Sequence, residues 1–544
     1  MGTDFSSLLS AIMPPSYVIP SDFDPSRHLS LVAKRRGVSP LKGMQKYLGT
    51  PGLLSMAGGL PNPDYFPFDE LTANVLAHDQ FPITPIGIAT SRGTLDWLWN
   101  LFVTKPLKAA ISVPKYSNQP DDIQLSTALQ YQMAKGIPHY ISLCREIVAK
   151  IHKPGYSNWE VLADDGNTDG WAKCVQTFCN PGEAVLYDEW TYPSALAAMK
   201  PYGVSAVPVA IDQQGMCSNN LREILESWDD NVRGSPRPHL MYIVPIGQNP
   251  TGATMGVERK QAIYDICVEY DVLIVEDDPY FFLQLGDYLP PAMRSTKYQD
   301  ADQVFIDHLS PSFLRFDHQG RVIRLETFSK TIAPGCRLGW TTCAPLFAER
   351  LERASETSTQ APCGFSQVLV TTLLEQWKYE GYIRWLHGLA VQYARRRTLF
   401  VDLLMQKFDI EIQSPCVDSK RSANIVYSAY QKLSPYAADI EKGRRPHIFT
   451  FTPPTSGMFV WLKFNLDGHR RTPEDGDETT ETLFWISVVK EGLLIGPGGM
   501  FAADQSVAKN STAGHFRISF STIKDEEMIA AVNMLAKAVD KFYA

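Results

Sequence analysis

The chain has 544 residues, of which 44% are hydrophobic and 11% aromatic, so it can bury a large core and form roughly two to four domains. Its formal net charge is −8 and its pI is about 5.8, which argues against nucleic acid or an anionic membrane as the main partner. The sequence also lacks an apolar run of about eighteen residues and a signal-like N-terminus. We therefore expect a cytoplasmic protein that acts on small molecules without stable membrane association.

The nine cysteines are spread from Cys144 to Cys416 and form no C-x-x-C pair. This distribution predicts reduced, intracellular thiols, and neither a disulfide framework nor a zinc site, so no metal is expected. The opening MGTDFS matches the myristoylation pattern at Gly2. A pattern this short also arises by chance, and the acylation is left open.

Apolar segments and helical patterns alternate through the middle of the chain. In the predicted helix at 256–270, the apolar residues from Ile263 to Tyr270 follow the spacing of one buried helix face. The strand-like runs lie at 159–166, 184–190, 239–245, 272–278 and 321–329. Because these runs are continuously apolar, we expect an α/β large domain whose mostly parallel sheet is covered by helices on both faces.

The C-terminal part is predicted to form a smaller α+β domain. It opens with a helix near 393–408 and continues through strand-like pieces at 457–464, 493–499 and 515–521. These patterns predict a small domain whose sheet is separate from that of the large domain.

Three parts of the chain are distinguished on this basis. We predict an N-terminal arm with part of the small domain at residues 1–90, a large domain at 91–385 and a C-terminal small domain at 386–544. Polar, proline-rich stretches are expected to be surface insertions at 286–320, 413–452 and 465–482. Their role is left open.

Polar side chains stand directly after four of the predicted strands. Ligands in open α/β sheets bind beyond the carboxyl ends of the strands, so these side chains are candidates for chemistry. The turn DGNTDGW opens a helix whose free N–H groups suit a phosphate, although a plain connection would look the same. Asn249 is extended because it precedes a proline. Asp277 and Tyr280 follow another strand, and Lys330 and Arg337 follow the last.

Together these groups match the needs of one cofactor. Pyridoxal 5'-phosphate needs a lysine for a Schiff base, a carboxylate that keeps its ring nitrogen protonated, donors to its ring oxygen and a phosphate cup. The motifs NPTG, EDDPY and SK with a following arginine resemble the fold-type I pyridoxal-phosphate aminotransferases. The similarity is greatest to the aromatic amino acid, 2-aminoadipate and kynurenine aminotransferase group, including the fungal aromatic enzymes. It runs from MAGGLPNPDYFPF at 56–68 to FRISFS at 516–521.

The resemblance implies a role for each motif residue. Lys330 would hold the cofactor covalently and move a proton at the substrate α-carbon, with its pKa lowered by burial at the floor of a cleft. Asp277 would pair with the ring nitrogen, while Tyr280 and Asn249 would donate to the ring oxygen. The phosphate would be held by residues of the turn and of the lysine loop, namely Asn167, Thr168, Thr327, Ser329 and Arg337.

Four further residues match family positions. Tyr192 would stack on the cofactor ring, although any one tyrosine could equally fill the core. Tyr131 would reach the phosphate of a neighbouring subunit, so a homodimer with shared active sites is expected. Arg517 would grip the substrate α-carboxylate with its planar fork, assisted by Asn249. Gly59 would let the backbone approach the substrate closely.

The implied activity is a ping-pong transfer of an amino group to 2-oxoglutarate from phenylalanine, tyrosine or tryptophan, or from 2-aminoadipate or kynurenine. Another reaction on the same cofactor, by a C–S lyase, decarboxylase or synthase, would retain Lys330 and Asp277. A pyridoxal-phosphate-binding regulator would need a winged helix-turn-helix, for which the N-terminal arm has no room. A dinucleotide oxidoreductase would need a G-x-G-x-x-G turn, and GPGGMF at 496–501 lacks that spacing. The preferred donor and the pathway are left open.

Overall fold

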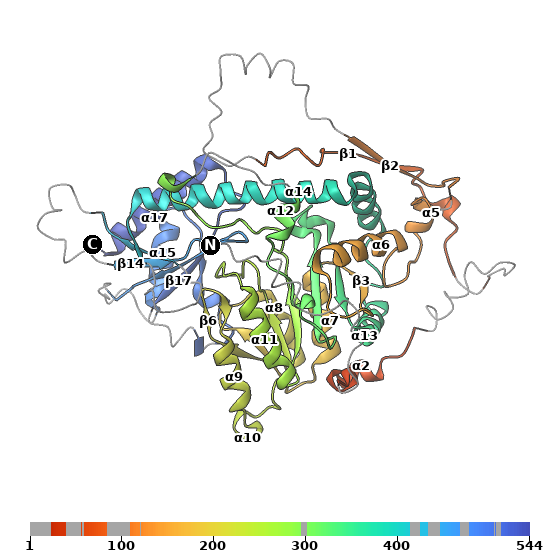
Figure 1. The fold of residues 1–544 in the computed structure, drawn as a ribbon, viewed down its shortest axis with the longest axis horizontal. Coiled ribbons are helices and arrows are strands. Elements are labelled where there is room, and N and C mark those ends of the chain that lie inside the picture. Colours follow the sequence, from red (N-terminus) through yellow and green to blue (C-terminus); the bar gives the residue numbers. More distant parts are fainter. Residues whose placement is uncertain are drawn as a thin grey trace, which may run out of the picture.

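The computed structural model describes residues 23–39, 56, 59–83, 109–119, 121–294, 302–413, 425–432, 447–467, 478–504, 506–507 and 513–543. Gly2 and parts of the predicted insertions at 413–452 and 465–482 lie outside these residues. Figure 1 shows a central sheet surrounded by helices, a second sheet near the C-terminal end, and the long helix α14 (Gly364–Lys407) running lengthwise beside both.

The central sheet forms from the apolar segments that the sequence predicts. Within the described residues, seven strands form it in the order β3-β11-β10-β9-β8-β4-β5. Strand β11 is antiparallel to both its neighbours and the other neighbouring pairs are parallel, which confirms the predicted mostly parallel sheet. The strands are β3 (Glu160–Asp164), β4 (Ala184–Asp188), β5 (Ser205–Val209), β8 (Leu240–Ile243), β9 (Leu273–Asp277), β10 (Val322–Thr327) and β11 (Gly339–Cys343).

Helices bury both faces of this sheet. Every residue of β4, β8, β9, β10 and β11 is buried. Along β4, Tyr187 packs into one apolar cluster and Leu186 into another, because successive side chains of a strand point to opposite faces. The helices of this part are α6 (Pro138–Ile147), α7 (Asn167–Phe178), α8 (Pro193–Met199), α9 (Ser218–Glu226), α10 (Asp230–Arg233), α11 (Val257–Glu269), α12 (Asp302–Asp307) and α13 (Pro345–Glu356).

The C-terminal part contains an antiparallel sheet. Its order within the described residues is β12-β13-β14-β15-β17-β16. The elements are β12 (Asp409–Gln413), β13 (Val426–Tyr430), β14 (His447–Phe451), β15 (Phe459–Phe464), β16 (Gly496–Pro497), β17 (Gly514–Ser519), α15 (Thr480–Lys490) and α17 (Asp525–Tyr543). The helix predicted near 393–408 is the C-terminal part of α14, which kinks at Lys378. The predicted boundary between 385 and 386 falls inside this helix, and the division into domains stays a prediction.

The N-terminal segment lies against the central part. Helix α2 (Leu31–Arg35) packs on α7, and the Leu31 N–H donates at 2.8 Å to Oδ1 of Asn180, which follows that helix. The remaining short elements are β1 (Glu70–Val75), β2 (Ala109–Pro114), α5 (Leu125–Ala128), β6 (Ile211–Asp212) and β7 (Gly215–Met216), of which β1 pairs with β2 and β6 with β7.

The stretch 286–320 is not a surface insertion along its whole length. Helix α12 packs against α14, where Phe305 stacks on His387. Phe313 and Leu314 are fully buried. The expectation of a surface insertion was wrong here because the few apolar side chains decide where this polar, proline-rich segment packs.

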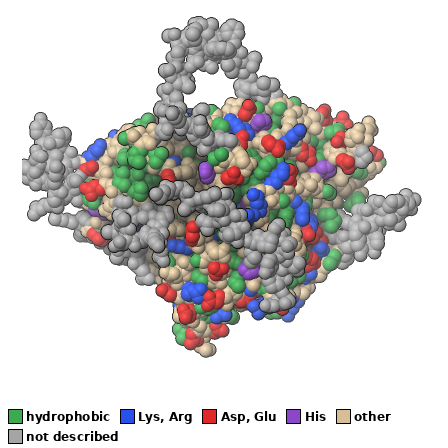
Figure 2. All heavy atoms as spheres, in the orientation of Figure 1, with side chains coloured by type: hydrophobic (Ala, Val, Ile, Leu, Met, Phe, Trp, Pro, Cys, Tyr) green, Lys and Arg blue, Asp and Glu red, His purple; other side chains and the backbone are tan. Residues whose placement is uncertain are grey.

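The surface carries mixed charge. On the face shown in Figure 2, acidic and basic side chains are interspersed. Among the described residues, no helix combines the length and apolar character needed to cross a bilayer.

Candidate active site

The carboxyl ends of three neighbouring strands bring the predicted chemical groups together. Strands β8, β9 and β10 are parallel and in register, with Ile243 opposite Glu276 and Leu325 opposite Asp277. Asp277 is the last residue of β9, and Lys330 ends the short helix η7 (Phe328–Lys330) directly after β10. The sheet therefore delivers an amine and a carboxylate to one edge.

Both oxygens of the Asp277 carboxylate accept hydrogen bonds. The side-chain amide of Asn167 donates to Oδ1 at 2.6 Å, and the hydroxyl of Tyr242 donates to Oδ2 at 2.5 Å. Burial raises the pKa of Asp277, and the two hydrogen bonds act in the opposite direction because they favour the anion. Asp277 is thus a buried carboxylate whose charge is supported by two neutral donors.

Lys330 is half-buried at the same carboxyl end of the sheet. Burial lowers the pKa of its amine, and the positive charges of Arg337 and Arg517 lower it further, while Asp277 opposes them. A lowered pKa raises the fraction of neutral amine near neutral pH, which a nucleophile or a general base requires.

A cup of donors lies beside Lys330, at the start of α7. Arg337 donates to Ser329 Oγ at 3.2 Å and to the Asp165 carbonyl at 2.7 Å. A Cβ on Gly166 would lie 2.7 Å from Arg337 Nη2, so only glycine, at φ +88°, leaves room for this guanidinium. No side chain caps the N-terminus of α7. Backbone N–H groups, hydroxyls and a guanidinium in one cup suit a phosphate dianion.

Arg337 itself has an unusual backbone. Its φ of 43° and ψ of 52° place it in the left-handed region, which non-glycine residues seldom adopt. Thr327 Oγ1 lies 2.8 Å from Ser329 Oγ and accepts from the Ser329 N–H at 3.1 Å, so the loop around Arg337 is tied to the end of β10. Such strain is found where a side chain must be held for binding.

Arg517 belongs to β17 of the second sheet, and its charge acts on Lys330. The central carbon of its guanidinium lies 4.5 Å from the ring centroid of Phe459 and 4.6 Å from that of Phe501. It donates to Asn249 Oδ1 at 2.8 Å. Burial lowers the pKa of Arg517, yet an arginine remains charged, so this cation is preformed for an anionic ligand.

Two predicted aromatic residues lie in the same region. Tyr280 is buried and packs edge-on against Phe459. Burial raises its pKa, and the charge of Arg517 acts against that shift. Tyr192 precedes α8 as its N-cap residue, and its phenol is close enough to Arg517 to act on the arginine pKa.

Three predicted residues are placed differently from the rest. The Asn167 side chain contacts Asp277 instead of the cup beside Arg337. Tyr131 is 58% exposed, and no described contact joins it to Lys330. Gly59 is exposed with open space around its Cβ position. The roles of Tyr131 and Gly59 stay predictions.

Sequence reasoning missed three neighbours of the site. Tyr242 sits inside the apolar run MYIVP, where it was interpreted only as part of a buried strand. Phe459 and Phe501 flank Arg517 but are far apart in the chain. A hydroxyl-bearing residue in an otherwise apolar strand is the one signal that could have marked Tyr242.

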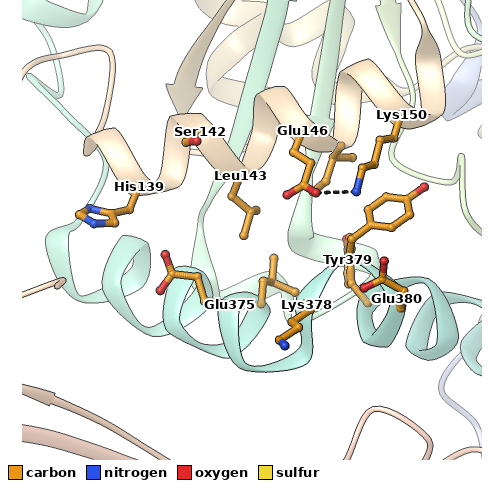
Figure 3. Close-up of a pocket in the computed structure, with 12 residues that line it drawn as sticks. His139, Ser142, Leu143, Glu146, Lys150, Glu375, Lys378, Tyr379 and Glu380 are labelled. Carbon is orange, nitrogen blue, oxygen red and sulfur yellow. Dashed lines mark hydrogen bonds and ion pairs between the residues drawn. The ribbon is translucent and has the colours of Figure 1, made fainter. Parts of the chain in front are cut away.

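A groove elsewhere on the described surface is separate from this site. Figure 3 shows it between α6 and α14, with the ion pair of Glu146 and Lys150 across from Tyr379. None of the described residues that line it is a predicted site residue. Tyr382, which also lines it, donates to Thr331 Oγ1 at 3.4 Å. The groove is thus connected through one hydrogen bond to the residue that follows Lys330.

The fold, the strand-end lysine and carboxylate, and the arginine cup define a fold-type I aminotransferase. The chain belongs to the family "Aminotransferase class I and II", which matches residues 109–535. It is 33% identical over 518 residues to an aromatic amino acid aminotransferase of Schizosaccharomyces pombe, covering 94% of this chain and 97% of that protein.

Two further comparisons agree. An L-tyrosine:2-oxoglutarate aminotransferase of Tapinella panuoides is 31% identical over 487 residues, which cover 88% of this chain and 82% of that protein. The crystal structure of aminotransferase Aro8 from Candida albicans superposes with a TM-score of 0.79 at 32% identity, covering 97% of this chain and 100% of that one.

The cofactor of this enzyme is pyridoxal 5'-phosphate, and the residues present fit it. The chain supplies one amine with a lowered pKa, one buried carboxylate, and a cup that a single Cβ at Gly166 would fill. The buried Asn167 Oδ1 has no hydrogen-bond partner among the described residues. These groups match a cofactor with an aldehyde, a basic ring nitrogen and a phosphate.

Proposed function

We propose that this aminotransferase moves the amino group of an aromatic amino acid to 2-oxoglutarate, with Lys330, Asp277 and Arg517 at its centre. The names of the similar proteins from Schizosaccharomyces pombe and Tapinella panuoides support the donor class, and the latter supports the acceptor. 2-Aminoadipate and kynurenine stay as alternative donors, because side-chain choice depends on pocket shape.

The proposed chemistry divides between the cofactor and the chain. When bound, pyridoxal 5'-phosphate supplies an electron sink for the electron pair left on the substrate α-carbon. Lys330 would bind the cofactor covalently and, once the substrate amine has displaced it, would take the proton from the substrate α-carbon and pass a proton on to the cofactor. Asp277 holds the ring nitrogen, and Arg337, Thr327, Ser329 and the first turn of α7 hold the phosphate.

Arg517 serves both halves of the reaction. Every amino acid donor and every 2-oxo acid acceptor carries the same α-carboxylate, so one arginine can bind both in turn. The rings of Phe459 and Phe501 both contact the guanidinium, and Asn249 accepts a hydrogen bond from one of its N–H groups. This preorganisation fits a ping-pong reaction, in which donor and acceptor occupy one site in succession.

One observation carries the proposal. Lys330 and Asp277 both lie at the carboxyl ends of neighbouring strands, beside a cup of donors that suits a phosphate. The test is to purify the protein and record its visible spectrum while adding tyrosine, phenylalanine, tryptophan, 2-aminoadipate or kynurenine. We expect a yellow protein that an aromatic amino acid bleaches, and the 2-oxo acid product with glutamate when 2-oxoglutarate is present. Ammonia or carbon dioxide as product would instead indicate an elimination or a decarboxylation.

We also propose a homodimer in which Tyr131 completes the partner's phosphate site. Large apolar side chains are exposed along one part of the chain, namely Met56, Leu60, Tyr65, Phe68, Leu76, Tyr116, Tyr131 and Met133. Large apolar side chains that are exposed on one copy favour an interface where an association buries them together. We propose that a second copy of this chain covers these residues, because Tyr131 of one copy would then reach the cofactor phosphate bound by the other.

Hybrid dimers test the shared site. Mixing Lys330→Ala with Tyr131→Phe chains should restore one intact site per hybrid dimer, because the Tyr131→Phe chain keeps its lysine and receives an unchanged tyrosine from its partner. If Tyr131 acts within its own chain, the mixture stays as inactive as the parents. Light scattering of the purified protein measures the dimer itself. The cytoplasmic location is kept as a proposal that cell fractionation can check.

A further inference from the structure

The carboxylate of Asp277 is held by two donors from two different elements. Tyr242 of β8 donates to Oδ2, and Asn167 at the first position of α7 donates to Oδ1. One oxygen is therefore bound from the strand side and the other from the helix side. The two donors leave the remaining lone pairs of Asp277 free for a third partner.

We propose that Asn167 and Tyr242 are positioning residues that hold Asp277 as an oriented anion, so that the proton it shares with the cofactor ring nitrogen stays on the nitrogen. We call this pair the Asp277 clamp. The inference rests on the proposed site, in which Asp277 faces that nitrogen. It assigns to Asn167 a role other than phosphate binding and to Tyr242 a role in the reaction.

The clamp acts on where one proton lies. The shared proton is either on the ring nitrogen, giving an ion pair with the carboxylate, or on Asp277, giving a neutral pair; no proton enters or leaves. Burial favours the protonated acid, whereas each donated hydrogen bond favours the carboxylate. The other charged groups that act on Asp277 are Arg324 of β10 and Lys330, and both also favour the anion.

The donors are rigid, which a positioning role requires. Tyr242 is buried, and its ring packs against Trp171 and Tyr187 with centroids 4.8 and 5.2 Å away. Asn167 is fixed by a second hydrogen bond, from Nδ2 to the Leu325 carbonyl at 3.2 Å. Neither side chain can turn away from Asp277 without leaving a buried polar group unpaired.

The test removes each donor separately. Tyr242→Phe deletes one oxygen, and Asn167→Ala deletes the amide while keeping the backbone of α7. Tyr187→Phe is the matched control, because Tyr187 belongs to the same aromatic cluster but donates to the Ala195 carbonyl at 3.3 Å. Asp277→Asn is the reference for complete loss of the carboxylate.

Two measurements are made on each variant. Cofactor-free protein is titrated with pyridoxal 5'-phosphate to give a dissociation constant, and protein loaded with ring-¹⁵N-labelled cofactor gives the nitrogen chemical shift, which reports protonation. We expect Tyr242→Phe and Asn167→Ala each to weaken binding by about tenfold, the effect of losing a hydrogen bond to a charged group, and to move the shift toward the neutral ring. Tyr187→Phe should match the unchanged protein in both.

The outcomes separate this inference from the proposed function. If Asp277→Asn loses the protonated ring while both clamp variants keep it and bind within about twofold of the unchanged protein, the clamp is wrong and the site stands. If Asp277→Asn also keeps the protonated ring, Asp277 does not face the nitrogen and the proposed site fails. Should one clamp variant not fold, the other alone decides, since each donor binds its own oxygen.

Discussion

The two faces of the β9–β10 strand pair differ in how their ionisable side chains are paired. Asp277 lies on one face, which we call the front, where Tyr242 and Asn167 donate to its carboxylate. Its neighbours Glu276 and Asp278 point to the rear, where they bind the guanidinium of Arg324. Successive residues of one short segment thus serve two different environments, because side chains along a strand alternate between the faces.

The rear face holds buried ionisable groups that pair with one another. Arg324 Nη1 lies 3.1 Å from Glu276 Oε2 and 3.0 Å from Asp278 Oδ2, and all three side chains are fully buried. His152 Nε2 lies 2.7 Å from Glu326 Oε1, and Arg324 Nε lies 3.4 Å from Glu326 Oε2. We call these five residues the rear cluster. Buried charge of this kind is stable only while every partner is present.

The front face, by contrast, holds basic side chains without a carboxylate partner among the described residues. In the described part of the chain, no ion pair within 4.0 Å joins Lys330, Arg337 or Arg517 to a carboxylate. Lys330 and Arg517 are half-buried, so their charges are poorly solvated without a ligand, and a phosphate or a carboxylate supplies the missing partner for all three cations. Substitutions on the front face should therefore reduce activity, and substitutions on the rear face should reduce stability.

The largest expected effect is on the front face. Lys330→Ala should lower kcat/KM by about 10⁴-fold, because the acid–base group and the covalent attachment are both lost. The melting temperature of the cofactor-free protein should change little, since a half-buried amine with a lowered pKa is removed. Steady-state kinetics measure the first, and the mass of borohydride-reduced holoprotein locates the attachment. Lys200→Ala, an exposed lysine, should keep both adduct and activity. An adduct retained in Lys330→Ala would mean that another lysine carries the cofactor.

The largest stability effect is expected at the rear. Arg324→Met leaves buried carboxylates uncompensated and should lower the free energy of unfolding by about 3–5 kcal/mol. Denaturant unfolding of the cofactor-free protein measures it. Arg395→Met removes an arginine that is 49% exposed and pairs with Asp525, so its effect should stay below about 1 kcal/mol. Equal effects of the two substitutions would erase the distinction between the faces.

The strand ends could be predicted from sequence, but the directions of their side chains could not. The apolar runs fix β8, β9 and β10, and therefore place Asp277 and Lys330 at one edge, because parallel strands end together. Asn167 was assigned to the phosphate from its place in the turn, whereas its rotamer is set by the carboxylate of Asp277 across the sheet. A turn motif locates a residue without stating which neighbour its side chain meets.

Arg517 illustrates the other limit. Its assignment came from a family position, and only the structure shows why the guanidinium stays in place. Phe459 belongs to β15 and Phe501 to the short helix η10 (Gly498–Phe501), and the fold brings both rings to one arginine. Contacts between distant segments leave no local pattern in the sequence, so the support of Arg517 could not be predicted.

A smaller front effect is expected at that arginine. Arg517→Gln should raise KM for both the amino acid and the 2-oxo acid by about 100-fold, because both lose the same charge-assisted pair with the α-carboxylate. The dissociation constant of the cofactor should not change. Lys463→Gln, on the neighbouring strand β15 and exposed, is the control and should leave KM unchanged. An Arg517→Gln enzyme with unaltered KM would remove this arginine from the substrate site.

The smallest expected effect is a pH dependence at the rear. Burial raises the pKa of Asp278 from 3.8 to about 7, even though Arg324 acts against the shift. In the unfolded chain this acid is already ionised above its ordinary pKa. Ionised Asp278 therefore costs stability above about pH 7, and the cost disappears as the pH falls from about 7 toward 4. The unchanged protein should lose stability through this group as the pH rises from about 5 to 8.

Asp278→Asn removes the titrating group but keeps an oxygen that can accept from Arg324. Its melting temperature should therefore fall less than that of the unchanged protein between about pH 5 and pH 8, whereas Asp540→Asn, at an exposed position, should leave the slope as it is. Because Asp277 lies on the opposite face, the cofactor dissociation constant should respond less to Asp278→Asn than to Tyr242→Phe. If the melting temperature of Asp278→Asn falls with pH as steeply as that of the unchanged protein, Asp278 is ionised beside Arg324 over the whole range. Burial would then not raise its pKa.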